Sequence, residues 1–210
     1  MYNMRLIIVR HGETEWNALK QTQGMSDTQL SDKGRRQARR LSYRLRPVRV
    51  AAAFTSPLGR AVETAHIITK FKHLDIIEEP DLREINFGDW EGRTFDRIRE
   101  LYPKELETWT TRPQDYDIPR GESLMDVAAR CTAFIERAKA RYERQTVLAV
   151  THSVPSKLLV AISIGLPVEN IHSLRMDNAS LTIIDFYPDR PIMRLFNDTT
   201  HLQEGVIWPK

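Results

Sequence analysis

A short aliphatic run near the start of the chain, Leu6-Ile7-Ile8-Val9, ends directly in Arg10-His11-Gly12. A continuous apolar run of this length is typical of a strand that is buried on both faces of a parallel sheet. Ligands of open α/β sheets bind at the carboxyl ends of such strands. The run therefore brings a guanidinium and an imidazole to the edge where a site is expected. Arginine binds phosphate bidentately and histidine can be a nucleophile, which together point to phosphoryl chemistry.

The rest of the chain alternates short apolar runs with amphipathic segments. This alternation is typical of an α/β fold with a largely parallel sheet. The sequence contains no internal repeat and no low-complexity linker, so we expect residues 1–210 to form a single domain. The predicted strands span residues 5–10, 50–55, 74–78, 146–151, 181–186 and 192–196.

Serine residues mark the points where three helices are expected to begin. Ser31 precedes one amphipathic segment, and Ser56 followed by Pro57 predicts an N-cap with proline at the first helical position. Ser123 and Asp126 resemble a capping box in which Asp replaces the usual Glu. These signals place helices between the predicted strands, as an α/β fold requires.

The segment from about residue 84 to residue 120 departs from this alternation. It is rich in glycine and proline and contains Trp90 and Trp109. Irregular segments of this length in compact domains are often functional loops. We expect it to form a lid or a small inserted subdomain over the carboxyl edge of the sheet.

The composition argues against several other classes of protein. Hydrophobic residues make up 41% of the chain and charged residues 28%, which is ordinary for a globular protein. The single cysteine, Cys131, excludes an internal disulfide, fits a reducing compartment and is expected to fill the core. No apolar run approaches the roughly 18–20 residues of a membrane span, and the run before Arg10 is too short for a secretory signal. We therefore expect a cytoplasmic protein with no membrane partner.

A basic run occupies positions 33–49, where eight Lys and Arg residues occur without one acidic residue. A nucleic-acid-binding face is one interpretation of this run. A solvated helix face is favoured, because no aromatic platform or nucleic-acid-binding motif accompanies it. The net charge of the chain is only +3, which can steer anionic substrates but does not imply nucleic acid. We expect no nucleic-acid partner.

Other charged residues are predicted to meet Arg10 and His11 at the same edge of the sheet. Arg60 falls in the first turn of the helix after the second strand, His152 follows the fourth strand, and Glu84 enters the irregular segment. Two arginines, two histidines and one carboxylate are sufficient for metal-free phosphoryl transfer. One imidazole attacks phosphorus, the cations hold the phosphoryl oxygens, and the acid protonates the leaving alkoxide.

The remaining histidines are interpreted as structural, because the sequence gives them no catalytic partner. They are His66, His73, His172 and His201. The Cys, His and carboxylate residues show no spacing that is typical of a metal site, so we expect no metal site.

In these features the chain resembles the histidine phosphatase superfamily, which includes the cofactor-dependent phosphoglycerate mutases. The resemblance covers essentially the whole chain, and the order and spacing of its motifs make it specific. The matching segments are 10–17 (RHGETEWN), Gln23-Gly24, 30–34 (LSDKG), Gln37-Ala38, 55–61 (TSPLGRA), 63–65 (ETA), 82–84 (LRE), 88–92 (GDWEG), 121–123 (GES), 151–153 (THS) and 197–199 (NDT).

The resemblance implies a three-layer α/β/α architecture, phosphatase action that needs no metal or organic cofactor, and a role for each matching residue. His11 would be the phosphate acceptor, and Glu84 would be the proton donor and then the base that activates water. Arg10, Arg60 and His152 would form the phosphate pocket. The further substrate-binding residues that the resemblance implies are Asn17, Gln23, Gly24 and Ser153, the last through its backbone N–H.

The sequence favours a phosphatase over a mutase. Mutases of the superfamily carry a longer insertion between the acid and the second histidine, whereas Glu84 and His152 are only 68 positions apart here. The segment 87–92 (FGDWEG) also resembles the broad-specificity and α-ribazole phosphatases more than the mutases. We expect a hydrolase of a small phosphorylated metabolite; a cofactor-dependent phosphoglycerate mutase is the alternative.

One departure from the family pattern concerns the shape of the substrate site. Many relatives have two glycines after the second histidine, where this chain has Ser153-Val154-Pro155. Metal-independent phosphoserine phosphatases share a similar turn and a stretch like 177–180 (DNAS), but they carry histidine in place of Phe87. Phosphoserine therefore remains an alternative substrate.

A binding protein on a catalytic fold that has lost its activity is disfavoured, because no pocket residue is lost. Relatives often form homodimers, so a homodimer is a further expectation.

Overall fold

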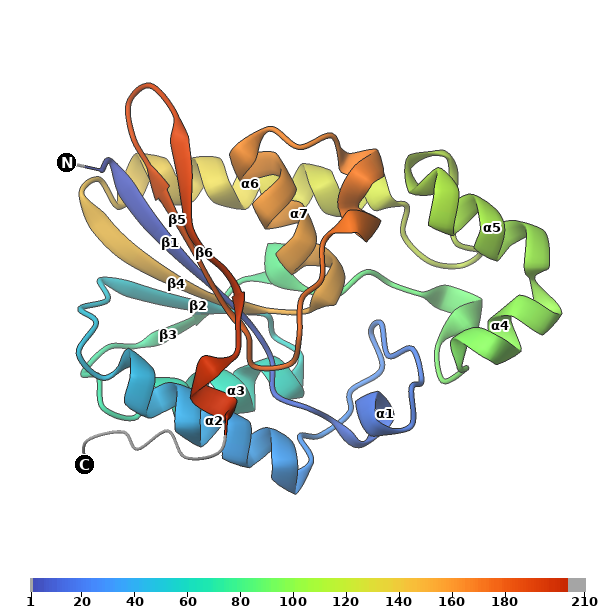
Figure 1. Ribbon diagram of the computed structural model, residues 1–210, viewed down its shortest axis with the longest axis horizontal. Coiled ribbons are helices and arrows are strands. Elements are labelled where there is room, and N and C mark those ends of the chain that lie inside the picture. Colours follow the sequence, from blue (N-terminus) through green and yellow to red (C-terminus); the bar gives the residue numbers. More distant parts are fainter. Residues whose placement is uncertain (1, 204–210) are drawn as a thin grey trace.

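The computed structural model describes residues 2–203 and contains one six-stranded sheet with the strand order β3-β2-β4-β1-β5-β6 (Figure 1). The predicted α/β class is confirmed, and each predicted strand is present with bounds that differ by at most two residues. The strands are β1 (Met4–Arg10), β2 (Ala52–Thr55), β3 (Ile76–Glu78), β4 (Gln145–Thr151), β5 (Leu181–Phe186) and β6 (Pro191–Asp198).

The sheet is mostly parallel. Strand β1 pairs in parallel with β4, and β2 pairs in parallel with both β4 and β3. Only β5 opposes this direction, because it pairs antiparallel with β1 on one side and with β6 on the other. Arg10 lies opposite Thr151 in the register, so the chain leaves β1 and β4 at the same edge of the sheet.

Helices cover both faces of the sheet and complete three layers (Figure 1). Strand β1 alternates its side chains between the layers: Ile7 and Val9 share a core cluster with α2 (Asp32–Leu45) and α3 (Gly59–Thr69). Leu6 and Ile8 share the other cluster with α6 (Leu124–Arg141) and α7 (Ser153–Ile164). The aliphatic run is fully buried on both faces, as the sequence predicts.

The helix starts follow the predicted caps with one exception. Ser31 caps α2 by accepting the Gly34 N–H at 3.1 Å, and the Ser123–Asp126 capping box of α6 is confirmed. The predicted N-cap at Ser56 is wrong, because α3 begins three residues later at Gly59. The Ser56 hydroxyl is instead engaged by the ring of His152, and the carboxylate of Asp27 accepts the Gly59 N–H at 2.9 Å.

The segment expected to be irregular contains two helices, α4 (Phe95–Leu101) and α5 (Pro103–Thr111), which were not predicted from the sequence. Both lie at one end of the molecule, beyond the carboxyl edge of the sheet (Figure 1). Trp90 stacks on Tyr116 at a centroid distance of 5.6 Å and meets Trp109 edge-on at 6.2 Å. The remaining short elements are α1 (Glu15–Ala18) and the 3-10 turns Pro80–Leu82, Gly88–Trp90, Pro113–Asp115, Val168–Ser173 and Thr200–Leu202.

Cys131 is fully buried on α6, which agrees with its predicted place in the core. Within residues 2–203, none of the helices combines the length and the apolar character that a membrane crossing would require.

Candidate active site

A cavity of about 250 Å³ opens at the carboxyl edge of β1 and β4. It holds seven of the nine predicted site residues, which come from five separate stretches of the chain. The cavity is close to the lower end of the roughly 300–1,000 Å³ that ligand pockets usually span, so it suits a small ligand. Its lining residues are Arg10, His11, Asn17, Gln21, Thr22, Gln23, Arg60, Glu84, Phe87, Phe95, Trp109, Ser153, Val154, Lys157 and His172.

His11 lies at the end of β1 and is only 2% exposed. Its Nδ1 is 2.7 Å from the carbonyl oxygen of Gly12. A carbonyl can only accept, so Nδ1 carries the proton and donates it to Gly12. Nε2 therefore keeps its lone pair. Burial, followed by the positive charges of Arg60 and Arg10, lowers the pKa of His11 well below its ordinary value of 6.5, so the imidazole is neutral at neutral pH.

Gly12 itself is required by close packing at the end of β1. A Cβ atom at this position would lie 2.7 Å from the carbonyl oxygen of Gly34, at the start of α2. The Gly12 backbone thus packs directly against the first turn of α2. This contact fixes the position of the Gly12 carbonyl oxygen, which accepts the proton of His11 Nδ1.

Two buried guanidinium groups face the same cavity. Arg10 donates to the carbonyl oxygen of Met176 at 2.5 Å, and Arg60 is fully buried. Arg60 donates to the carbonyl oxygens of Ser26 at 2.8 Å and Gly24 at 2.7 Å. Burial lowers the pKa of Arg60 to about 10, which still leaves the group charged at neutral pH. The cavity therefore presents two fixed cations beside a neutral imidazole.

His152 and Gly24 are predicted site residues that do not line the cavity. His152 is fully buried behind His11, with a ring-centroid distance of 5.0 Å and an edge-on geometry. Its Nδ1 accepts from Arg60 Nε at 3.2 Å, so its Nε2 donates to the Ser56 hydroxyl at 2.8 Å. In this structure both residues hold the Arg60 guanidinium rather than facing the cavity.

Glu84 projects its carboxylate toward the first turn of α7. Its Oε2 accepts the Ser153 N–H at 3.0 Å, and its Oε1 accepts the Val154 N–H at 3.2 Å. Free N–H groups at a helix start favour an anion, and here the acid of the site occupies that position. The Ser153 N–H, expected to touch the substrate, is thus bonded to Glu84.

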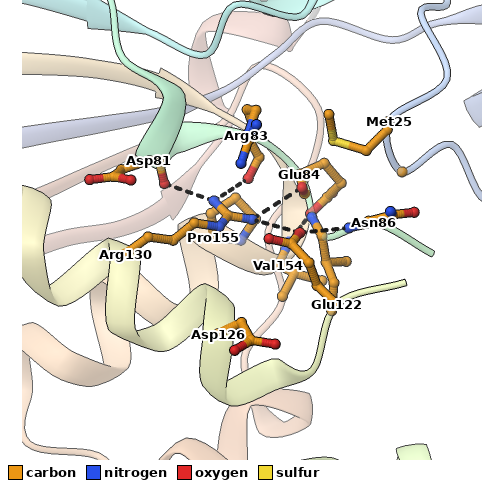
Figure 2. Close-up of polar contacts among 12 residues, drawn as sticks. Met25, Asp81, Arg83, Glu84, Asn86, Glu122, Asp126, Arg130, Val154 and Pro155 are labelled. Carbon is orange, nitrogen blue, oxygen red and sulfur yellow. Dashed lines mark hydrogen bonds and ion pairs between the residues drawn. The ribbon is translucent and has the colours of Figure 1, made fainter. Parts of the chain in front are cut away.

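The backbone around Glu84 is held by Arg130 of α6 (Figure 2). Arg130 donates to the carbonyl oxygens of Asp81 at 2.7 Å, Arg83 at 2.6 Å and Glu84 at 3.1 Å. The same guanidinium reaches the carboxylate of Glu122 at 3.3 Å, and that carboxylate accepts the Asn86 N–H. One side chain therefore fixes the loop on both sides of the candidate acid.

Asn17 and Gln23 present amide groups to the cavity. The Asn17 Oδ1 accepts from the Thr14 N–H and from Asn178 Nδ2, each at 3.1 Å. The Gln23 Oε1 accepts from the Thr28 hydroxyl. Because their oxygens are engaged by protein donors, both side chains are oriented to offer N–H groups to a ligand.

Several lining residues were not predicted from the sequence, among them Phe87, Trp109, Lys157 and His172. His172, interpreted as structural, is placed in the cavity wall with its Nε2 2.9 Å from the carbonyl oxygen of Trp109. For Lys157 a signal existed in the sequence: it lies four residues after Ser153, which puts both on one face of α7. Residues 2–203 contain no cluster of His, Cys, Asp and Glu that could hold a metal ion.

Comparison with known proteins identifies relatives of the whole chain. Residues 6–199 match the family model for the histidine phosphatase superfamily, branch 1. "Phosphoserine phosphatase 1" of Hydrogenobacter thermophilus is 34% identical over 201 residues, covering 96% of this chain and 95% of the relative. "Probable phosphoglycerate mutase GpmB" of Photorhabdus laumondii is 35% identical over 209 residues, covering 95% of each. The crystal structure of the alpha-ribazole phosphatase from Shigella flexneri aligns with a TM-score of 0.84 and 30% identity, covering 93% of this chain and 97% of that one.

Proposed function

The chain belongs to the histidine phosphatase superfamily and is a phosphatase, and from this premise we propose that it hydrolyses small phosphomonoesters through a phosphohistidine on His11. The observation that carries the proposal is the state of His11. A buried, neutral imidazole has Nδ1 bonded to the Gly12 carbonyl and Nε2 free, beside the guanidinium groups of Arg10 and Arg60.

In the first step, the lone pair of His11 Nε2 attacks phosphorus and the bond from phosphorus to the ester oxygen breaks. Arg10 and Arg60 bind the three non-bridging oxygens, on which the negative charge is spread. Nδ1–H remains bonded to the Gly12 carbonyl and stabilises the charge on the phosphorylated ring. Glu84 gives its proton to the leaving alkoxide, so the products are an alcohol and phosphohistidine.

In the second step, water attacks the phosphorus of the phosphohistidine. Glu84 now removes a proton from that water, the bond between phosphorus and Nε2 breaks, and phosphate leaves. The imidazole is returned neutral with its proton still on Nδ1. Each step conserves charge and protons without a metal ion.

Glu84 can hold its backbone contacts and a proton at once. Its Oε1 accepts two N–H groups, from Ile85 and Val154, whereas its Oε2 accepts only that of Ser153. A carboxyl oxygen has two lone pairs, so Oε2 has room for a proton while it still accepts from Ser153. The acid is therefore positioned before the substrate binds.

The size and walls of the cavity support a small metabolite as the substrate. The named relatives act, by their names, on phosphoserine and α-ribazole phosphate, or are described as mutases of phosphoglycerate. A mutase must protect its phosphohistidine from water until a second alcohol arrives. The short interval between Glu84 and His152 favours hydrolysis, and a 3- to 2-phosphoglycerate assay that depends on 2,3-bisphosphoglycerate separates the two activities.

The test is hydrolysis of p-nitrophenyl phosphate in the presence of EDTA. We expect the wild type to be active and His11→Ala to lose at least about 10³-fold in kcat/KM, because the covalent route is gone. His66→Ala, which changes an exposed histidine on α3, is the matched control and should keep wild-type activity. Activity that EDTA abolishes, or that His11→Ala retains, would contradict the proposal.

A further inference from the structure

The wall of the cavity contains a cation that the proposed phosphoryl chemistry does not use. Lys157 lines the cavity from α7, one helical turn beyond Ser153 and on the same face. Four residues of an α-helix rise about 6 Å along its axis, so Lys157 lies further from the Glu84 contact than Ser153 does. Its amino group makes no hydrogen bond or ion pair with any residue of the described range 2–203.

The surroundings of Lys157 are unfavourable to a lone charge. The side chain is partly buried, and burial followed by the nearby charge of Arg10 lowers its pKa below the ordinary 10.5. Within residues 2–203, Glu84 is the carboxylate that lines the cavity; its charge opposes this lowering, but its oxygens are held by three backbone N–H groups and make no ion pair with Lys157. An ammonium that lacks an anionic partner in such a place is costly unless a ligand supplies one.

The charges of the cavity leave Lys157 available for a second group of the substrate. The two guanidinium groups of Arg10 and Arg60 match the two negative charges of a phosphomonoester. Glu84 must be protonated to act as the acid, so it adds no negative charge in the reactive complex. Among the described residues that line the cavity, Lys157 is then the remaining cation, and its charge is not required to balance the phosphoryl group.

The walls on this side limit what the second group can be. Phe87 and Trp109 meet edge-on at a centroid distance of 6.1 Å, and Phe95 also lines the cavity. His172 is tied to the Trp109 carbonyl. A cavity of about 250 Å³ that already contains a phosphoryl group has room for a short carbon skeleton with one compact anion.

We propose that Lys157 determines specificity by binding a carboxylate of the substrate, which makes short phosphorylated hydroxy acids or amino acids the preferred class. This inference rests on the proposed phosphatase function and assigns the substrate's distal group. Charge-assisted contacts of this kind change affinity by about 10- to 100-fold.

Two pairs of substrates that differ only by a carboxylate test the inference. Phosphoserine is compared with phosphoethanolamine, and 3-phosphoglycerate with ethylene glycol phosphate. In the wild type we expect kcat/KM to be at least about 10-fold higher for the carboxylated member of each pair. In Lys157→Met this ratio should fall toward one, chiefly through KM, and Lys157→Arg should restore most of it. Lys139→Met, an exposed lysine on α6, is the control and should leave the ratio unchanged.

The outcomes separate this inference from the proposed function. A wild type that hydrolyses p-nitrophenyl phosphate but shows no preference within either pair overturns the role of Lys157 and leaves the phosphatase standing. The role of Lys157 is equally overturned if Lys157→Met lowers kcat/KM by the same factor for both members of a pair, because Lys157 would then serve the phosphoryl group. A wild type without any phosphatase activity contradicts the proposed function instead. The wild-type ratios need no variant, so the test survives a variant that fails to fold.

Discussion

At the residue scale, the proton position on His11 decides whether the site can work, and it can be measured directly. We expect the His11 ring to stay neutral, with the proton on Nδ1, as the pH falls from 8 through 6.5, because its pKa is lowered well below 6.5 by burial and by two arginines. Nitrogen NMR of the labelled free protein, assigned with His11→Asn, reports both properties. A midpoint at or above pH 6.5, or a proton on Nε2, would contradict the nucleophile we describe.

The role of Glu84 predicts a dependence on the leaving group. Glu84→Gln cannot donate a proton, so we expect hydrolysis of an alkyl phosphate such as glycerol phosphate to fall by about 10²- to 10⁴-fold. Nitrophenolate is a good leaving group without protonation, so p-nitrophenyl phosphate should lose far less in the first step. Steady-state kinetics on both esters checks this. An equal loss on both esters would indicate that Glu84 positions the site and does not act as the acid.

Residue identities in the site were largely predictable from the sequence, but their contacts were not. Arg10, His11 and Arg60 line one cavity because they follow parallel strands that end at one edge. The position of His152 behind His11 depends on hydrogen bonds to Ser56 and Arg60, which no spacing in the sequence specifies. The same holds for the Ser153 N–H, whose partner is a carboxylate 69 positions away.

At the element scale, α6 supports the loop that carries Glu84 through a single arginine. Arg130→Met removes donors to three carbonyl oxygens next to Glu84, and we expect kcat to fall by about 10²-fold with a small change in KM, because a misplaced acid still allows binding. Lysine lacks the planar fork, so Arg130→Lys should not restore kcat fully. The measurement is steady-state kinetics on an alkyl phosphate.

Arg137→Met is the control for this prediction. Arg137 lies on the same helix but binds the exposed side of the loop, through the side chains of Glu79 and Asp81, and it is itself 53% exposed. Exposed ion pairs contribute little, so we expect kcat to stay close to the wild-type value. If both variants lose activity alike, the Arg130 contacts have no special role in positioning the acid.

Strands and helices were predictable from the sequence where a single local signal, such as an aliphatic run or a capping box, dominated. The buried strands follow from continuous aliphatic runs, and α6 follows from its capping box. Proline and glycine in this segment predict irregular structure, which does not allow for α4 and α5; Pro103 is the first residue of α5, where its missing N–H costs nothing. The Ser56 hydroxyl accepts the Leu58 N–H at 3.3 Å and contacts the His152 ring, but the helix itself starts only at Gly59, so the serine lies before the first turn and does not cap it.

At the scale of the whole molecule, buried histidines make stability depend on pH. Burial lowers the pKa of His11 and His152, and it lowers that of His201 to about 4. Below pH 6.5 the unfolded chain binds protons that the folded protein does not, so the free energy of unfolding falls as the pH falls. Each such histidine contributes up to about 1.4 kcal/mol per pH unit between 6.5 and its folded pKa.

Urea unfolding at pH 7.5, 6.5 and 5.5 measures this dependence. We expect stability to decrease below pH 6.5, and His201→Asn to reduce that decrease, since it removes one of the buried histidines. His66→Asn, which replaces an exposed histidine, is the control and should leave the slope unchanged. A free energy of unfolding that stays constant between pH 6.5 and 5.5 would contradict the burial of neutral histidines.

The ion-pair partners of the basic residues at positions 33–49 depend on the whole fold. The basic run forms much of α2, where Lys33 pairs with Glu13, Arg35 with Glu63, and Arg44 with Asp198, all acids distant in sequence. Arg36, Arg39 and Arg40 on the same helix are exposed, as the interpretation of a solvated helix face expects. Likewise Lys157 resembled an ordinary helix lysine until the fold placed it in the cavity wall.

The most direct test of the proposed mechanism is the detection of the phosphoryl group on His11 during turnover. The enzyme is mixed with a phosphomonoester, quenched within the first turnover under alkaline conditions that preserve phosphohistidine, and mapped by mass spectrometry. We predict phosphorylation of the peptide that contains His11, at Nε2, with a burst of alcohol that matches its amount. A protein that turns over its substrate with no burst, and with no phosphoryl group on His11 at any time, would contradict the mechanism.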